Sequence, residues 1–160
     1  MRIFIRLIIL LIIFTVSEVK SQNRWVKVYH DETDAPMKYI VESYDKGYLL
    51  SGKHGANYSK YNWLIKTDIN GEILWEKTIG DGIHTITMIE MVQNNEGAIY
   101  LCGGSRYVDP IGDPLIIKLD SCGEKEWCKI FYTQDNHDYS QSICLTPDQG
   151  CAVTLRYTNP

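Results

Sequence analysis

The sequence predicts an all-β chain built from repeated, four-stranded antiparallel units. Two independent sequence elements recur with a period close to fifty residues, and each period divides into four short apolar segments separated by Gly, Asp and Asn. No segment after residue 21 has a helical periodicity. Four-stranded units of about forty to fifty residues are typical of β-propeller blades. A β-sandwich is the structural alternative, but it needs no such repeat.

The first twenty-one residues predict a targeting segment rather than a part of the fold. Arg2 and Arg6 give it a positive start, residues 7–16 are apolar apart from one Thr, and residues 19–21 end in a small residue. An uncleaved membrane anchor is the alternative, but about ten apolar residues are too few to cross a hydrocarbon core of about 30 Å. We therefore expect a signal peptide over residues 1–21 and a secreted or cell-surface protein.

The charge balance bears on the choice of partner. The formal net charge is −4, and it becomes −6 when residues 1–21 are removed. Such a surface repels phosphate backbones and anionic lipid, so neither nucleic acid nor a membrane surface is an expected partner. The hydrophobic share of 44% and the charged share of 22% are near globular averages, which argues against a disordered chain.

The strands of the first unit are expected at residues 39–44, 48–53, 63–67 and 72–79, which are rich in Ile, Leu, Tyr, Val and Trp. A glycine begins the second strand of each unit. These glycines are Gly47, Gly97 and Gly150, which are 50 and 53 residues apart. The repeat region, residues 22–160, then divides into units at about 30–80, 81–131 and 132–160, of which the last is incomplete.

The second repeated element joins an aspartate, a glycine and a tryptophan at a spacing of 52 residues. It consists of Asp68, Gly71 and Trp75 in one unit and of Asp120, Gly123 and Trp127 in the next. The aspartate caps backbone groups, and the glycine takes the positive φ that closes a hairpin turn. The tryptophan falls in the fourth strand, where a large ring suits packing between units. A platform for stacking on a carbohydrate ligand is the alternative.

This Asp-x-x-Gly-x-x-x-Trp pattern resembles the tryptophan-docking motif of quinoprotein-like propellers, with a turn one residue shorter. The units resemble a repeat of secreted Bacteroidota-type propeller proteins, which often carry a C-terminal type IX secretion sorting domain. The resemblance covers nearly all of residues 25–157 and implies a propeller fold and export. It carries over neither a sorting domain nor a ring of quinone-contacting residues.

The predicted ring does not close within these residues. Residues 25–29 match the fourth strand of the later units, and the third unit contains its first two strands only. The sequence thus predicts a partial β-propeller of about 2.5 blades plus an N-terminal fourth strand. Because propellers have at least about four blades, we expect the remaining blades C-terminal to Pro160.

Three polar residues are weak candidates for ligand binding. His84 and His137 are 53 residues apart, each thirteen residues before a turn glycine, and Asp34 holds that position in the first unit. They fall in the connections from an outer strand to the next inner strand, which line one face of a propeller. A ring of His and Asp there suits a metal or an anionic group. The alternative is a loop residue that satisfies backbone groups.

Catalytic and cofactor chemistry has little support in the sequence. The five cysteines form no CxxC pair and lie far from any histidine, so a zinc site is not expected, and export permits one disulfide without requiring it. We predict no catalytic residue, no metal and no cofactor. The leading hypothesis is a non-catalytic extracellular module that binds protein or glycan through its loops. The alternative is an exported polysaccharide hydrolase or quinoprotein-like oxidoreductase whose site needs the complete ring.

Overall fold

The computed structural model describes residues 26–29, 36–53, 61–108, 112–132 and 137–157. All regular structure in these residues is β, which confirms the predicted all-β class. The strands are β1 (Met37–Glu42), β2 (Tyr48–Lys53), β3 (Asn62–Thr67), β4 (Ile73–Ile79), β5 (Ile86–Gln93), β6 (Ile99–Ser105), β7 (Asp113–Leu119), β8 (Lys125–Ile130), β9 (Tyr139–Leu145) and β10 (Cys151–Arg156). Across the described ranges, no helix is long and apolar enough to cross a membrane. The predicted signal peptide and Asp34 lie outside these residues.

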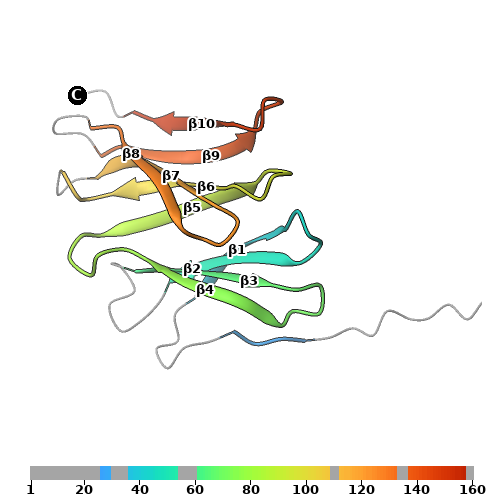
Figure 1. Cartoon of the computed structure of the whole chain (residues 1–160). Helices are drawn as coiled ribbons and strands as arrows, with labels where there is room; N and C mark the ends of the chain where they lie inside the picture. Colours follow the sequence, from blue (N-terminus) through green and yellow to red (C-terminus); the bar gives the residue numbers. More distant parts are fainter. Residues whose placement is uncertain (1–25, 30–35, 54–60, 109–111, 133–136, 158–160) are drawn as a thin grey trace, which may run out of the picture.

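The strands form three antiparallel units that follow chain order. Sheet 1 has the order β1-β2-β3-β4, sheet 2 has the order β5-β6-β7-β8, and β9 pairs with β10 in a hairpin. The three units are stacked on one another (Figure 1). The first strand of each unit contacts the first strand of the next, since β5 lies against both β1 and β9. We call the contact between sheets 1 and 2 the first junction, and that between sheet 2 and the hairpin the second junction.

The turn between the third and fourth strands has the same geometry in both sheets. In sheet 1, the N–H of Gly71 donates to the carbonyl of Asp68 at 3.1 Å, and the N–H of Asp68 donates to the carbonyl of Glu72 at 2.9 Å. Gly71 has a φ of 78°, as the hairpin prediction requires. The backbone N–H of Glu72 also binds the Asp68 carboxylate at 2.8 Å and lowers its pKa. In sheet 2 the same geometry is formed by Asp120, Gly123 and Glu124.

The turn between the first and second strands corrects the glycine alignment. Its positive-φ positions are Lys46, Gly97 and Gln149, which are 51 and 52 residues apart. Gly47 and Gly150 therefore follow the position that Gly97 holds. Gly47 is needed for a different reason, because a Cβ there would lie 2.0 Å from the carbonyl oxygen of Thr67. The sequence repeat matches the three glycines to one another, whereas the backbone conformation matches Lys46, Gly97 and Gln149 as the equivalent turn positions.

A β-bulge lies in the first strand of each unit, where that strand pairs with the second strand of the same unit. The extra residues are Lys38, Ile89 and Gln141, again 51 and 52 residues apart. Opposite the first two bulges lie Gly52 and Gly103, where a Cβ would lie 2.6 Å from the Pro36 carbonyl oxygen and 1.9 Å from the Thr87 carbonyl oxygen. The bulges therefore explain a pair of strand glycines that turn chemistry does not.

The largest hydrophobic cluster fills the first junction. Its buried side chains come from both sheets: Leu49, Leu64, Met88, Met91, Ile99, Leu101, Leu115, Ile117 and Leu119. Full burial of one such side chain contributes about 1.5–3 kcal/mol. Because neither sheet buries this face alone, the two sheets stabilise each other.

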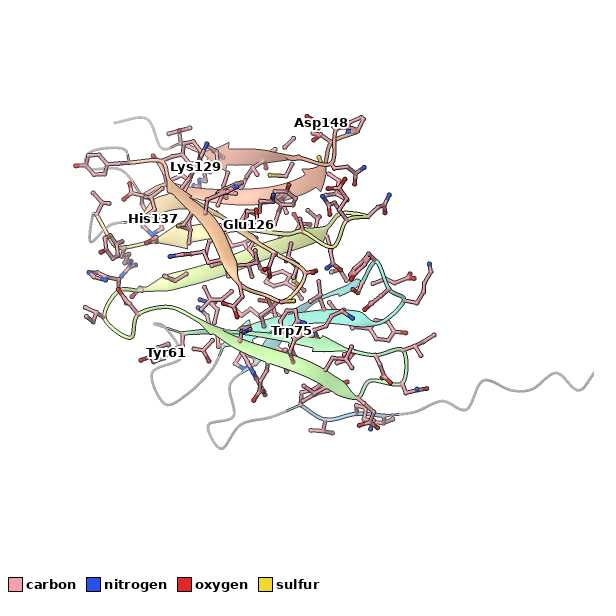
Figure 2. The ribbon with its side chains drawn as sticks, viewed as in Figure 1. Tyr61, Trp75, Glu126, Lys129, His137 and Asp148 are labelled. Atoms are coloured by element: carbon pink, nitrogen blue, oxygen red, sulfur yellow. The ribbon has the colours of Figure 1, made fainter. Side chains whose placement is uncertain are left out.

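Trp75 packs between sheets 1 and 2, as the sequence predicts. Its ring lies against the hydrophobic cluster and over the Gly123 turn of the next sheet, where an added Cβ would lie 3.0 Å from the ring (Figure 2). Trp127 likewise points toward the unit that follows its own. It packs on a second cluster between sheet 2 and the hairpin, and its ring centre lies 6.3 Å from that of Tyr100. Both rings are partly buried against protein, which favours the packing role over ligand stacking.

Hydrogen bonds link the turns of successive units at the end of the stack opposite His137. Ser43 Oγ donates to Gln93 Oε1 at 2.6 Å, and Gln93 Nε2 donates to the carbonyl of Gly97 at 2.8 Å. One unit further, Asn94 Nδ2 donates to the carbonyl of Gln149 at 2.9 Å. Since each turn is tied to the next, the stack is cross-linked at its polar rim as well as through its core.

We predict that Gly123→Ala lowers the free energy of unfolding by about 1–3 kcal/mol, because alanine is strained at positive φ and its methyl group meets Trp75. Chemical denaturation of the full protein measures this change. In the double variant Gly123→Ala/Trp75→Ala, the combined loss should be smaller than the sum of the two single losses, because the clash is removed. Strict additivity would show that the ring does not dock on this turn.

Candidate functional site

A cavity of about 330 Å³ lies at the second junction, near the end of the stack where Figure 2 shows His137. We call it the junction cavity. Its wall consists of Thr85, Thr87, Ile89, Gly104, Ser105, Arg106, Gly112, His137, Asp138 and Tyr139. These residues come from the approach to β5 and β5 itself, from the end of β6 and the residue after it, from the residue before β7, and from the approach to β9 and its first residue. The wall therefore combines charged groups, hydroxyl groups and the rings of His137 and Tyr139.

Two side chains occupy the equivalent place in the first junction. Lys53 Nζ donates to the carbonyl of Ile86 at 3.0 Å and lies 3.4 Å from Thr87 Oγ1. Asn62 Nδ2 donates to the same carbonyl at 3.0 Å, and its Oδ1 accepts the Met88 N–H at 3.3 Å. Both side chains are buried. They hold the first strand of sheet 2 against sheet 1.

Burial has an electrostatic consequence for Lys53. Desolvation lowers the pKa of its ammonium group, and the nearby charge of Lys38 lowers it further. The protein nevertheless keeps the group at the first junction, where it donates to a backbone carbonyl. Lys53 thus makes a specific polar contact at the expense of its hydration.

The strand register identifies the residues that replace this pair at the second junction. Gly52 and Gly103 both lie opposite a bulge, so Gly104 corresponds to Lys53. Gly52 pairs with Trp63 and Gly103 pairs with Leu115, so Pro114 corresponds to Asn62. Neither glycine nor proline has a side-chain hydrogen-bond donor. The junction cavity is the space that the lysine side chain fills in the preceding unit.

The second junction uses other contacts to hold the hairpin. Ser140 Oγ donates to the carbonyl of Leu115 at 3.2 Å, and the N–H of Asp138 donates to the carbonyl of Gly112 at 3.0 Å. Glu90 accepts the Ile143 N–H at 2.7 Å. These bonds lie beside the cavity or further along β9, so the cavity stays open while the hairpin remains attached.

The two candidate histidines occupy different environments. His137 is exposed at the wall of the junction cavity, with its ring 6.1 Å from that of Tyr139. His84 packs against the Tyr107 ring at 4.2 Å, and its Nδ1 lies 2.6 Å from Asp81 Oδ2. Hydrogen bonds from the backbone N–H and the ring of His84 hold the pKa of the Asp81 carboxyl well below its usual range. His84 therefore belongs to a local turn that is closed by the Asp81 carboxylate.

The proposed equivalence of His84 and His137 needs a correction of one residue. His137 lies four residues before the bulge at Gln141, and the residue four before the bulge at Ile89 is Thr85. Thr85 and His137 both line the junction cavity, whereas His84 does not. The error follows from the alignment of Gly47 and Gly150 with Gly97, which is shifted by the same one residue. Asp34 is four residues before the bulge at Lys38 but lies outside the described residues.

The cysteines and acidic groups offer no further site. All five cysteines are described and are free thiols, and burial raises the pKa of Cys102 to about 11, with a smaller contribution from Glu90. Over the residues whose placement is described, no three His, Cys, Asp or Glu side chains gather where they could hold a metal ion.

Sequence reasoning missed Gly104 in the cavity wall and Lys53, which fills the equivalent place at the first junction. The signal was present, because these residues hold the same place after the strand glycines Gly52 and Gly103. It was hidden because a repeat search looks for residues that recur, whereas this site is formed where the repeat is broken.

We predict that Lys53→Ala lowers the free energy of unfolding by about 1–3 kcal/mol, because it empties the first junction and removes a donor to Ile86. Thermal or chemical denaturation of the full protein checks this. Lys38→Ala is the matched control, since Lys38 is an exposed lysine on a neighbouring strand and its loss should change stability by about 0.5 kcal/mol or less. Equal effects of the two substitutions would contradict the assigned role of Lys53.

No protein-family model matches this chain, and no curated protein matches it either. The chain's own geometry therefore carries the functional inference.

Proposed function

We propose that this chain is an exported β-propeller module that binds a ligand without transforming it. The propeller is supported by successive antiparallel sheets whose first strands lie side by side and whose tryptophans point toward the next unit. Export is supported by the charge and apolar pattern of residues 1–21. The resemblance to secreted Bacteroidota-type propeller proteins agrees with both.

The observation that carries ligand binding is the junction cavity. It lies where the connections between units meet, which is where propellers and other repeat folds commonly place their binding residues. Its wall supplies the positive side chain of Arg106, the hydroxyl group of Ser105 and the ring of Tyr139. Such a mixture fixes the orientation of a polar ligand. These groups suit reversible binding of a polar ligand.

We further propose that additional units complete a ring. Residues 26–29 contact the turn of sheet 1 as β4 contacts the turn of sheet 2. Lys27 pairs with Glu72 just as Lys77 pairs with Glu124. Tyr29 also donates to the carbonyl of Gly71 at 2.7 Å. These contacts support the proposal that the N-terminal segment stands in for a preceding unit's fourth strand.

The coding region tests the ring directly. A further turn with the Asp-x-x-Gly-Glu pattern should follow Asp120 by about 52 residues, where it would receive Trp127 as the Gly123 turn receives Trp75. Sequencing the transcript past the codon for Pro160 provides the measurement. A stop codon at that point would contradict the expected continuation.

Binding without turnover is the second expected outcome. The full secreted protein, screened against an array of glycans and extracellular proteins, should retain at least one ligand. The same preparation should leave a panel of polysaccharides uncleaved and should not reduce a dye in the presence of added quinone cofactor. Cleavage or dye reduction at rates typical of enzymes, about 1 s⁻¹ or more, would replace the proposal with the enzymatic alternative.

A further inference from the structure

One strand position differs sharply among the three units. It lies at the end of the second strand and is occupied by Lys53, Gly104 and Arg156. Lys53 donates to a backbone carbonyl at the first junction. Arg156 donates through Nη1 to Tyr139 Oη at 2.8 Å and lies 5.5 Å from the centre of that ring. The position thus carries a cation in two units and no side chain in the unit that forms the junction cavity.

The groups that receive the lysine have counterparts at the cavity. The carbonyl of Ile86 accepts the Lys53 ammonium, and the register makes Asp138 the equivalent of Ile86. The Asp138 carbonyl lies at the cavity wall, 4.0 Å from the point where a Cβ on Gly112 would be. A carbonyl oxygen has two lone pairs and can accept more than one hydrogen bond. Gly104 and Pro114 provide no side-chain donor to it.

We infer that the junction cavity binds a primary ammonium group on a short alkyl chain, such as the side chain of a ligand lysine. At the second junction, the ammonium group would take the place that corresponds to that of Lys53 at the first junction. This inference rests on the proposed function, because it identifies the ligand class of the same cavity. The volume of about 330 Å³ accommodates a four-carbon chain and its ammonium group.

Charge and ring contacts support a cation in this place. Asp138 is a wall residue with 1% of its surface exposed, so its negative charge is buried beside the cavity. The ring of Tyr139 already supports the guanidinium of Arg156, which shows that it can receive a cation. The exposed side chains of Arg106 and His137 would instead favour an anion, so binding of an anionic ligand is the competing outcome of the test.

Three small probes of equal chain length distinguish these outcomes. The full protein is titrated with n-butylammonium, n-butanol and butyrate while amide chemical shifts are followed by NMR. We expect n-butylammonium to shift the amides of Thr87 and Gly104 with saturation, and the alcohol and the carboxylate to bind at least about tenfold more weakly. Preferred binding of butyrate, or equal binding of all three probes, would overturn the inference. This comparison uses the unmodified protein and does not depend on how a variant folds.

Gly104→Lys is the sharpest variant, because it restores the side chain of the preceding unit. A Cβ at Gly104 would lie 3.4 Å from Tyr139 Cβ and 3.7 Å from the Asp113 carbonyl, which are ordinary contacts. We expect this variant to fold and to weaken n-butylammonium binding by at least about tenfold. Gly104→Ala is the matched control and should retain binding, since a methyl group leaves most of the cavity open. Unchanged binding in a folded Gly104→Lys protein would contradict the assignment.

The result separates this inference from the function on which it rests. If the array detects a ligand but none of the three probes binds at Gly104, the ammonium assignment fails and the binding role stands. If the protein instead turns over a polysaccharide or reduces the dye, the binding role itself fails, whatever the probes do.

Discussion

The carbonyl of Ile86 accepts hydrogen bonds from Lys53 and Asn62, two buried side chains of the preceding sheet. This contact joins the first residue of β5 to β2 and β3 of sheet 1, so it helps to set where sheet 2 lies. A buried donor that loses its acceptor costs about 1–3 kcal/mol. The two sheets consequently have a polar reason, in addition to the shared hydrophobic cluster, to keep one arrangement.

The second junction keeps the hydrophobic and turn contacts but gives up this polar pair. Trp127 and Ile143 pack between sheet 2 and the hairpin, and Asn94 ties the neighbouring turns together. Gly104 leaves space where the first junction has a lysine. A repeated architecture can thus open a cavity at one junction by changing two residues, Lys53 to Gly104 and Asn62 to Pro114, while the other contacts hold the neighbouring unit in place. In a repeat protein, a binding site is expected at a junction that has lost one of the structural contacts found at the others.

Much of the fold could be predicted from the sequence, because turn chemistry and strand patterning are local. Asp68 and Gly71 specify their hairpin through contacts within five residues, and the same is true of their counterparts in sheet 2. The alignment of Gly97 with Gly47 failed by one residue, since a lysine at position 46 takes the left-handed conformation that glycine takes at 97. The bulges escaped notice because they depend on pairing with a neighbouring strand.

The candidate site was less accessible to prediction. His137 was found for a reason that the structure corrects, and His84 proved to be part of a turn with Asp81. Lys53 and Gly104 gain their meaning only when two junctions are compared in space, because their neighbours across the junctions, Ile86 and Tyr139, lie more than thirty residues away in the chain. Non-local contacts of this kind leave no periodic signal.

Native-state hydrogen exchange on the full protein tests most directly whether the junctions make the units one cooperative structure. If the contact at Ile86 locks the sheets together, the protected amides of Leu64 in β3 and Leu101 in β6 should open with free energies that agree within about 1 kcal/mol. Leu64 pairs within sheet 1 and Leu101 pairs within sheet 2. Strand pairing inside either sheet would therefore not by itself make the two opening free energies agree. If sheet 1 instead opens by itself, at a free energy lower by about 2 kcal/mol or more, the sheets are independent and the account is contradicted.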